Sequence, residues 1–132
     1  MSIQIQNERD QQVAVLAESL YLINLLLVPV FAFLVLLWVY LRKQHSLSSL
    51  AISHLRQTIS ASLWAGLLLT IISLGIFAGG YDMGATWVAV LVYITVCHST
   101  LVIFGMLGLA KAMAGQNYQY PIIGRYLLIR EH

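Results

Sequence analysis

The sequence predicts an all-α integral membrane protein with three transmembrane helices, an interfacial amphipathic loop helix and a short amphipathic C-terminal tail, in one domain over residues 1–132. Of the 132 residues, 60% are hydrophobic and 9% are charged, which is more apolar surface than a soluble domain of this size can bury. Three apolar runs have the roughly 20 residues that a helix needs to cross a hydrocarbon core of about 30 Å. They span residues 20–41, 59–79 and 86–110.

The first run contains a proline near its middle. Pro29 removes one backbone donor and crowds the carbonyl of Leu25, so we expect the helix to kink or break there. Asn24 lies about one turn earlier and is placed to satisfy a backbone group that the proline frees. The run is otherwise large and apolar on every side, as expected for contact with lipid or with a broad partner surface.

The loop before the second run predicts an interfacial helix. Leu47, Leu50, Ala51 and Leu55 fall on one helical face, and Ser46 is a plausible N-cap. We expect this helix to lie at the membrane surface and to run into the second span.

The second and third runs carry small residues at helical spacing. In lipid, helices associate through close backbone approach at such residues. The residues expected to make helix packing or partner contacts are Ser62, Gly66, Ser73, Gly75, Gly79, Thr95 and Gly105.

His98 is predicted to lie near the bilayer midplane, halfway along the third run. An ionisable group at that depth costs several kcal/mol unless it faces a partner or a cavity. Three interpretations stay open: a neutral imidazole hydrogen-bonded to the second span, a partner contact, or a cofactor ligand or proton relay. Haem or chlorin ligation would need a second chain, because His54 lies about 20 Å below His98 along the helices. Cys97 is the single cysteine, so no Cys-based metal site is predicted.

Basic residues predict the orientation. Arg42, Lys43 and Arg56 flank the first loop, whereas the connection at residues 80–85 carries only Asp82. Basic loops stay on the cytoplasmic side, so three spans place the N-terminus outside and the C-terminus in the cytoplasm of a bacterial inner membrane.

The tail at residues 115–132 is expected to lie against the inner face and to meet the loop, forming a small cap. Pro121 and Gly124 would shape a turn, and basic side chains would reach lipid phosphates. The residues assigned to this cap and to lipid headgroups are Arg42, Lys43, His54, Arg56, Pro121, Gly124, Arg125 and Arg130.

Several of these segments carry a family resemblance. Pro29 in the first span, His54-Leu55-Arg56-Gln57 at the start of the second, and Gly115 followed by residues 120–125 resemble a bacterial family of small three-helix membrane proteins of unknown function. That family is related to the Tic-twenty component of the chloroplast import machinery. An acidic residue often precedes the His in the family, where this chain has Ser53, and Ser60 stands where an Asn is common. The resemblance implies a fold and a membrane location.

Three functions remain open at this point. The first is a non-catalytic membrane subunit or accessory protein that packs against and stabilises a larger inner-membrane complex. The expected partners are the lipid bilayer and either a larger membrane protein complex or other copies of the chain in a homo-oligomer. The second, implied by the resemblance, is a part of a translocation or transport assembly. The third is a cofactor-binding subunit that uses His98. The sequence has no Ser/His/Asp set, paired carboxylates, HExxH or phosphate-binding glycine loop, which argues against an enzyme. A net charge of +2 is too sparse for nucleic-acid binding.

Overall fold

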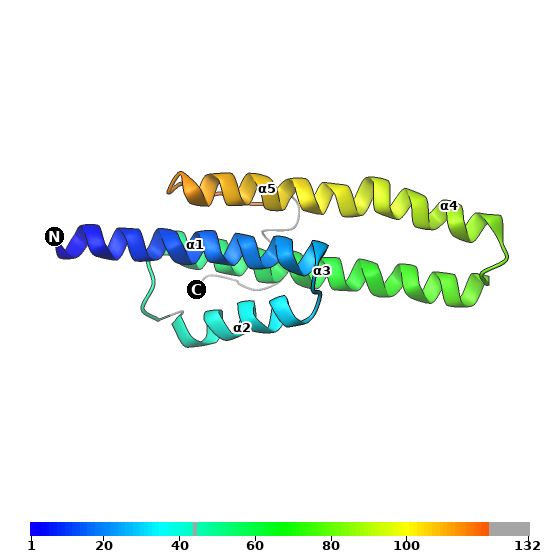
Figure 1. Cartoon of the computed structure of the whole chain (residues 1–132), viewed down its shortest axis with the longest axis horizontal. Helices are drawn as coiled ribbons and strands as arrows, with labels where there is room; N and C mark the ends of the chain where they lie inside the picture. The colour runs from blue at the N-terminus through cyan, green and yellow to red at the C-terminus, as the bar shows by residue number, and fades with distance from the viewer. Residues whose placement is uncertain (44, 122–132) are drawn as a thin grey trace.

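The computed structural model describes residues 1–43 and 45–121, in which every regular element is helical (Figure 1). The elements are α1 (Ser2–Leu26), α2 (Phe31–Lys43), α3 (Ser49–Gly79), α4 (Gly84–Val92), the π-helix η1 (Tyr93–His98) and α5 (Ser99–Met113). The last three form one continuous rod, Gly84–Met113. The all-α prediction is therefore confirmed for the described residues.

Two of the described helices, not three, are long and apolar enough to cross a membrane. The predicted spans at residues 59–79 and 86–110 lie within Ser49–Gly79 and Gly84–Met113. A short turn joins these helices, and they run side by side in opposite directions (Figure 1).

The predicted span at residues 20–41 is wrong. Its residues belong to α1 and α2, which run in opposite directions and form a helical hairpin (Figure 1). The apolar residues on the two sides of the turn, 20–26 and 31–41, would reach only about 10 and 17 Å at roughly 1.5 Å per residue. Neither length crosses a hydrocarbon core of about 30 Å.

The turn between α1 and α2 explains the reversal. Pro29 cannot continue a helix, and Val30 adopts the left-handed conformation with φ 74°. The Val30 N–H donates to Oδ1 of Asn24 at 3.2 Å, so the expected break and the expected role of Asn24 are confirmed. A kinked helix keeps its direction, whereas this cap holds the chain in a full turn.

The reversal brings both ends of the described chain together. Gln6 donates to the carbonyl of Ser46 at 3.5 Å, and Gln11 donates to the carbonyl of Met113 at 2.6 Å. The N-terminal helix therefore lies beside the end of α5, at the same end of the molecule. The prediction of three spans places the N-terminus and the C-terminal segment on opposite sides of the membrane, whereas the structure has the start of α1 and the end of α5 at the same end of the molecule (Figure 1).

The predicted loop helix is part of α3. This helix begins at Ser49 with Ser48, not Ser46, as its N-cap residue. Its apolar face does not lie on a membrane surface, because Ala51 and Leu55 are buried in a core cluster shared by α1, α2 and α3. The described part of the tail, residues 115–121, contains no helix, and residues 122–132 lie outside the described chain.

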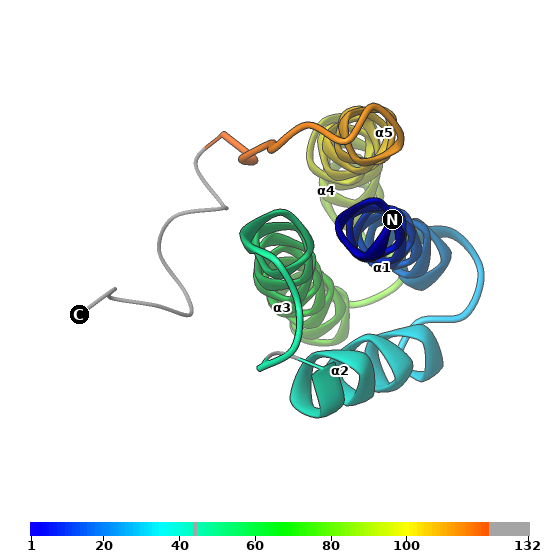
Figure 2. The ribbon, with the colours of Figure 1, turned by 90° about the vertical axis from the view of Figure 1, so that its left-hand side faces the viewer.

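The two halves of the molecule differ in thickness. Seen end-on, α1 lies between α5, α3 and α2, and α2 lies on the side of α1 and α3 away from α5 (Figure 2). Beyond the α1–α2 turn, α3 and α4 continue as a pair, and large apolar side chains such as Phe77 and Leu91 are exposed there. The thick half buries the polar side chains described below.

Candidate functional site

A buried carboxylate lies at the centre of the thick half. Glu18 is fully buried (0% exposed), on a face of α1 whose small residues Ala14 and Ala17 are buried with it. Oε1 of Glu18 lies 2.6 Å from Nδ1 of His54 and accepts from Nε2 of Gln57 at 2.5 Å. Its other oxygen, Oε2, accepts the hydroxyl of Tyr120. Residues far apart in sequence therefore form one polar cluster, Glu18, His54, Gln57 and Tyr120.

The imidazole of His54 links α1 to the chain that follows α5. Its Nε2 lies 3.0 Å from the carbonyl oxygen of Gln116, which can only accept, so Nε2 carries a proton. One further proton is shared between Nδ1 and Oε1 of Glu18. Three donors around the carboxylate suit a carboxylate–imidazolium pair. Removing one partner of a buried pair of this kind lowers the free energy of unfolding by several kcal/mol.

Tyr120 anchors the segment after α5. Its side chain is 2% exposed, and its ring lies 5.6 Å from that of Tyr21 and 6.0 Å from that of Phe104. Burial, together with the neighbouring Glu18 carboxylate, raises the pKa of the Tyr120 phenol well above its usual range. The hydroxyl therefore stays protonated and donates to Glu18.

Two glycines of α5 allow α1 to approach closely. A Cβ at Gly105 would come within 2.8 Å of the Tyr21 ring. A Cβ at Gly108 would collide with the carboxylate of Glu18. The polar cluster fits between the helices only because these positions lack side chains.

The structure separates the residues predicted to pack. Ser62 and Gly105 are buried, and Gly79 faces the side chain of Thr86 across the turn between α3 and α4. The remaining members of the set are exposed in this chain: Gly66, Ser73, Gly75 and Thr95. A Cβ at Gly66 or Gly75 would have nothing within 4 Å.

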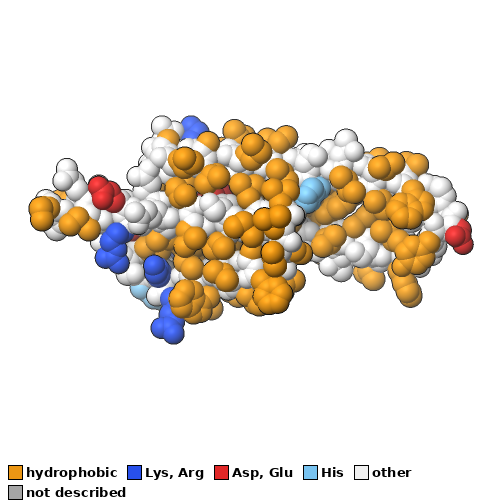
Figure 3. Space-filling model, in the orientation of Figure 1, with side chains coloured by type: hydrophobic (Ala, Val, Ile, Leu, Met, Phe, Trp, Pro, Cys, Tyr) orange, Lys and Arg blue, Asp and Glu red, His pale blue; other side chains and the backbone are white. Residues whose placement is uncertain are grey.

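The residues predicted for the inner-face cap are also dispersed. His54 lies at the core of the polar cluster, Arg56 is half-buried, and Arg42, Lys43 and Pro121 are exposed. Gly124, Arg125 and Arg130 lie outside the described residues. Blue basic side chains gather on the half of the molecule that holds the N-terminus, and apolar side chains cover the rest of this face (Figure 3).

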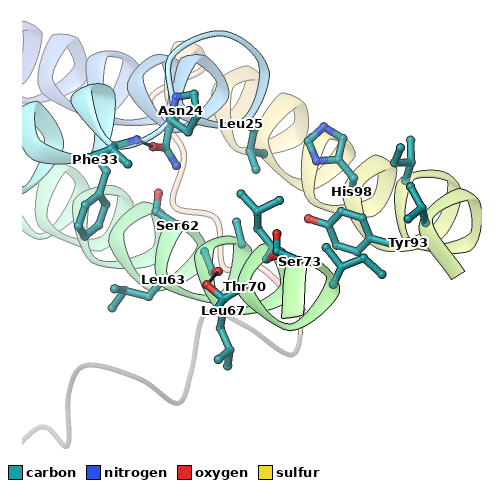
Figure 4. Close-up of a pocket in the computed structure, with 18 of the residues that line it drawn as sticks. Asn24, Leu25, Phe33, Ser62, Leu63, Leu67, Thr70, Ser73, Tyr93 and His98 are labelled. Atoms are coloured by element: carbon teal, nitrogen blue, oxygen red, sulfur yellow. Dashed lines mark hydrogen bonds between the residues drawn. The ribbon is translucent and has the colours of Figure 1, made fainter. Parts of the chain in front are cut away.

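His98 ends the π-helix η1 and lines a separate cavity. This cavity of about 780 Å³ lies between α3, η1 and the α1–α2 turn. Figure 4 shows Tyr93 and His98 on one wall and Asn24 and Ser62 on the other. His98 is half-buried, and Thr95 on the same π-helix is exposed. Among the described residues, no group of three or more His, Cys, Asp and Glu side chains could hold a metal ion.

The sequence did not predict that Glu18, Tyr120 and Gly108 belong to a site. One available signal was the helical spacing of Ala14, Ala17, Glu18 and Tyr21, which places a carboxylate on a face otherwise suited to close packing. In the family that the chain was expected to resemble, an acidic residue often precedes the His, and this chain has Ser53 there. The structure places a carboxylate beside His54 from another helix, that of Glu18. Only the fold brings Glu18 next to His54.

These features define a small helical membrane protein with two candidate spans and a buried polar cluster at one end. The model of the magnetosome magnetite crystal formation protein family matches residues 9–127. The chain therefore belongs to that family, a small bacterial family of membrane type. Nothing in the comparisons supports the relationship to the Tic-twenty component. No curated protein and no solved structure matches the chain.

Proposed function

We propose that this chain is a non-catalytic membrane accessory protein of magnetite crystal formation that acts by packing against other proteins within the membrane. Membership of the magnetosome magnetite crystal formation family supports a role in this process. The end of the molecule opposite the polar cluster has little surface with which to bind a mineral, since a short turn with one charged residue, Asp82, joins α3 to α4. A contribution through partners in the bilayer fits this shape better than direct templating of the crystal.

The observation that carries the proposal is the exposed small residues of the thin half. A Cβ at Gly75 on α3 would have nothing within 4 Å, and Thr95 is exposed on η1. Small residues at helix surfaces in lipid permit close contact with another helix. Neither residue is covered by another part of the described chain, so the fitting occupant is a helix of a larger membrane complex or of another copy.

The orientation belongs to the same proposal. Basic residues of the described chain lie at the end where α1 begins and α5 ends, among them Arg9, Arg42 and Lys111. The positive-inside rule then places this end in the cytoplasm. The α1–α2 hairpin enters the membrane from that side and returns to it, and the turn after α3 faces the opposite compartment. The membrane is a bacterial inner membrane or the magnetosome membrane.

The test is complementation in a magnetite-forming bacterium that lacks its own copy. Wild type should restore crystal size and number, measured by electron microscopy, and Gly75→Leu should leave crystals close to those of the deletion strain. Leu74→Ile is the matched control, because Leu74 is 63% exposed on the same helix and the exchange remains apolar. A photo-crosslinker at position 75 should capture a membrane protein. Full restoration by Gly75→Leu at equal protein levels would contradict the proposal.

A further inference from the structure

The cavity beside His98 has the form of a ligand site reached through the membrane. It lies halfway along the two candidate spans, Ser49–Gly79 and Gly84–Met113. Rim residues such as Leu67 and Ile94 are about half exposed, 48% and 51%, so the cavity opens on the molecular surface at that depth. Its volume of about 780 Å³ lies within the usual range of small-molecule sites, roughly 300–1,000 Å³. A ligand entering here arrives from the lipid.

One wall holds two buried polar side chains, Ser62 and Asn24, that line the cavity. Ser62 is 5% exposed, and its hydroxyl has no hydrogen-bond partner among the described residues. Asn24 is 9% exposed, and its Oδ1 already accepts the Val30 N–H, so the amide NH₂ is the part left to donate. Figure 4 shows the Asn24 amide and the Ser62 hydroxyl directed toward one another on this wall of the cavity. An unmade hydrogen bond of a buried hydroxyl is unfavourable until an acceptor occupies the space.

The opposite wall is built by the π-helix. In an α-helix, residues five apart point about 140° away from each other. The wider i→i+5 turn of η1 instead brings Tyr93 and His98 to the same side, with ring centroids 6.4 Å apart. Both rings line the cavity. They present an aromatic surface together with a phenol and an imidazole.

The lining contains no Asp, Glu, Lys or Arg, so its ligand is neutral. Its polar groups can donate from two opposite walls, which calls for a ligand with acceptor oxygens on both sides of a flat body. The remaining lining is apolar and suits a hydrocarbon tail. We propose that this cavity binds the head of an isoprenoid quinone, with its carbonyl oxygens facing Ser62 and Asn24 on one wall and Tyr93 and His98 on the other. This binding site is independent of the proposed accessory function.

The test uses the full chain in lipid nanodiscs and a short-tailed ubiquinone analogue as the probe, with affinity measured by calorimetry. Saturable binding should be seen with wild type. Ser62→Ala should weaken it roughly five- to tenfold, because one hydrogen bond is lost, and it removes a hydroxyl that has no partner within the described chain. Gly66→Phe should abolish binding, since Gly66 lines the cavity and a Cβ there meets open space.

Leu74→Phe is the matched control. Leu74 lies on the same helix and is 63% exposed, but it does not line the cavity. This variant should bind the probe as wild type does. An alkylbenzene with the same tail and no carbonyl oxygens should bind at least tenfold more weakly than the quinone. Equal affinity for the two probes, or equal quinone affinity in wild type and Ser62→Ala, would show a site for lipid chains and overturn the proposal.

Discussion

Glu18 is the residue on which the most interactions converge. It pairs with His54 and also accepts from Gln57 and Tyr120, all without exposure to solvent. Removing its charge leaves a buried imidazole and a buried phenol without their acceptor. Loss of one partner of a buried pair costs about 3–5 kcal/mol.

We therefore expect Glu18→Leu to lower the free energy of unfolding in detergent by about 3–5 kcal/mol. Thermal unfolding followed by circular dichroism would measure it. Glu8→Leu is the control, because Glu8 lies on the same helix and is exposed. Similar unfolding of the two variants would mean that the cluster adds nothing to stability.

Tyr120 makes stability depend on alkaline pH. The raised pKa of its buried phenol means that the unfolded chain, with an ordinary value of 10.0, loses this proton first. Stability from this group is thus fully present below about pH 10 and falls as the pH rises further. Phenylalanine cannot ionise, so the free energy of unfolding of Tyr120→Phe should decrease less steeply at alkaline pH than that of wild type. The free energy of unfolding would be measured against pH above about 10 for wild type and Tyr120→Phe. The same slope for both proteins would contradict the raised pKa of Tyr120 as a source of the alkaline loss of stability.

At the scale of elements, the α1–α2 hairpin depends on a strained turn. Val30 has φ 74°, a conformation that costs a β-branched residue about 1–2 kcal/mol. Val30→Gly should therefore stabilise the protein by about 1 kcal/mol, seen as a higher unfolding temperature. Val28→Gly, in the same turn but at an ordinary φ, should not. Destabilisation by Val30→Gly would show that the valine side chain contributes more by packing than it costs in strain.

The same hairpin explains how a proline can yield two different structures. A kink at Pro29 would keep one long helix, whereas the Asn24 cap on Val30 closes a turn. Reversal is also favoured because the polar side of α1, including Asp10, finds buried partners beside α3. Asp10 is 2% exposed and accepts the Ser48 N–H at 3.3 Å, next to the start of that helix.

At the scale of the whole molecule, the structure predicts that residues 8 and 111 face the same compartment and residue 82 the other. Single cysteines at these positions in a Cys97→Ser background would be labelled with a membrane-impermeant maleimide in intact vesicles. We expect Glu8→Cys and Lys111→Cys to react together, and Asp82→Cys to react only from the opposite side. Joint labelling of positions 8 and 82 would instead support three spans.

Composition and apolar run length alone predicted a membrane protein and located the two helices that are long and apolar enough to cross, together with a third run, residues 20–41, that is not one helix. They also located the break at Pro29, since a proline's lost donor is a local property. The direction of the chain after that break, and the meeting of Glu18 with His54 and Tyr120, were decided by the tertiary structure. These outcomes depend on contacts between residues 36 and 102 positions apart. From sequence alone, a carboxylate just before an apolar run is expected to lie in water at the end of a helix. Its burial depends on hydrogen-bond donors from other parts of the chain, which only the tertiary structure brings next to it.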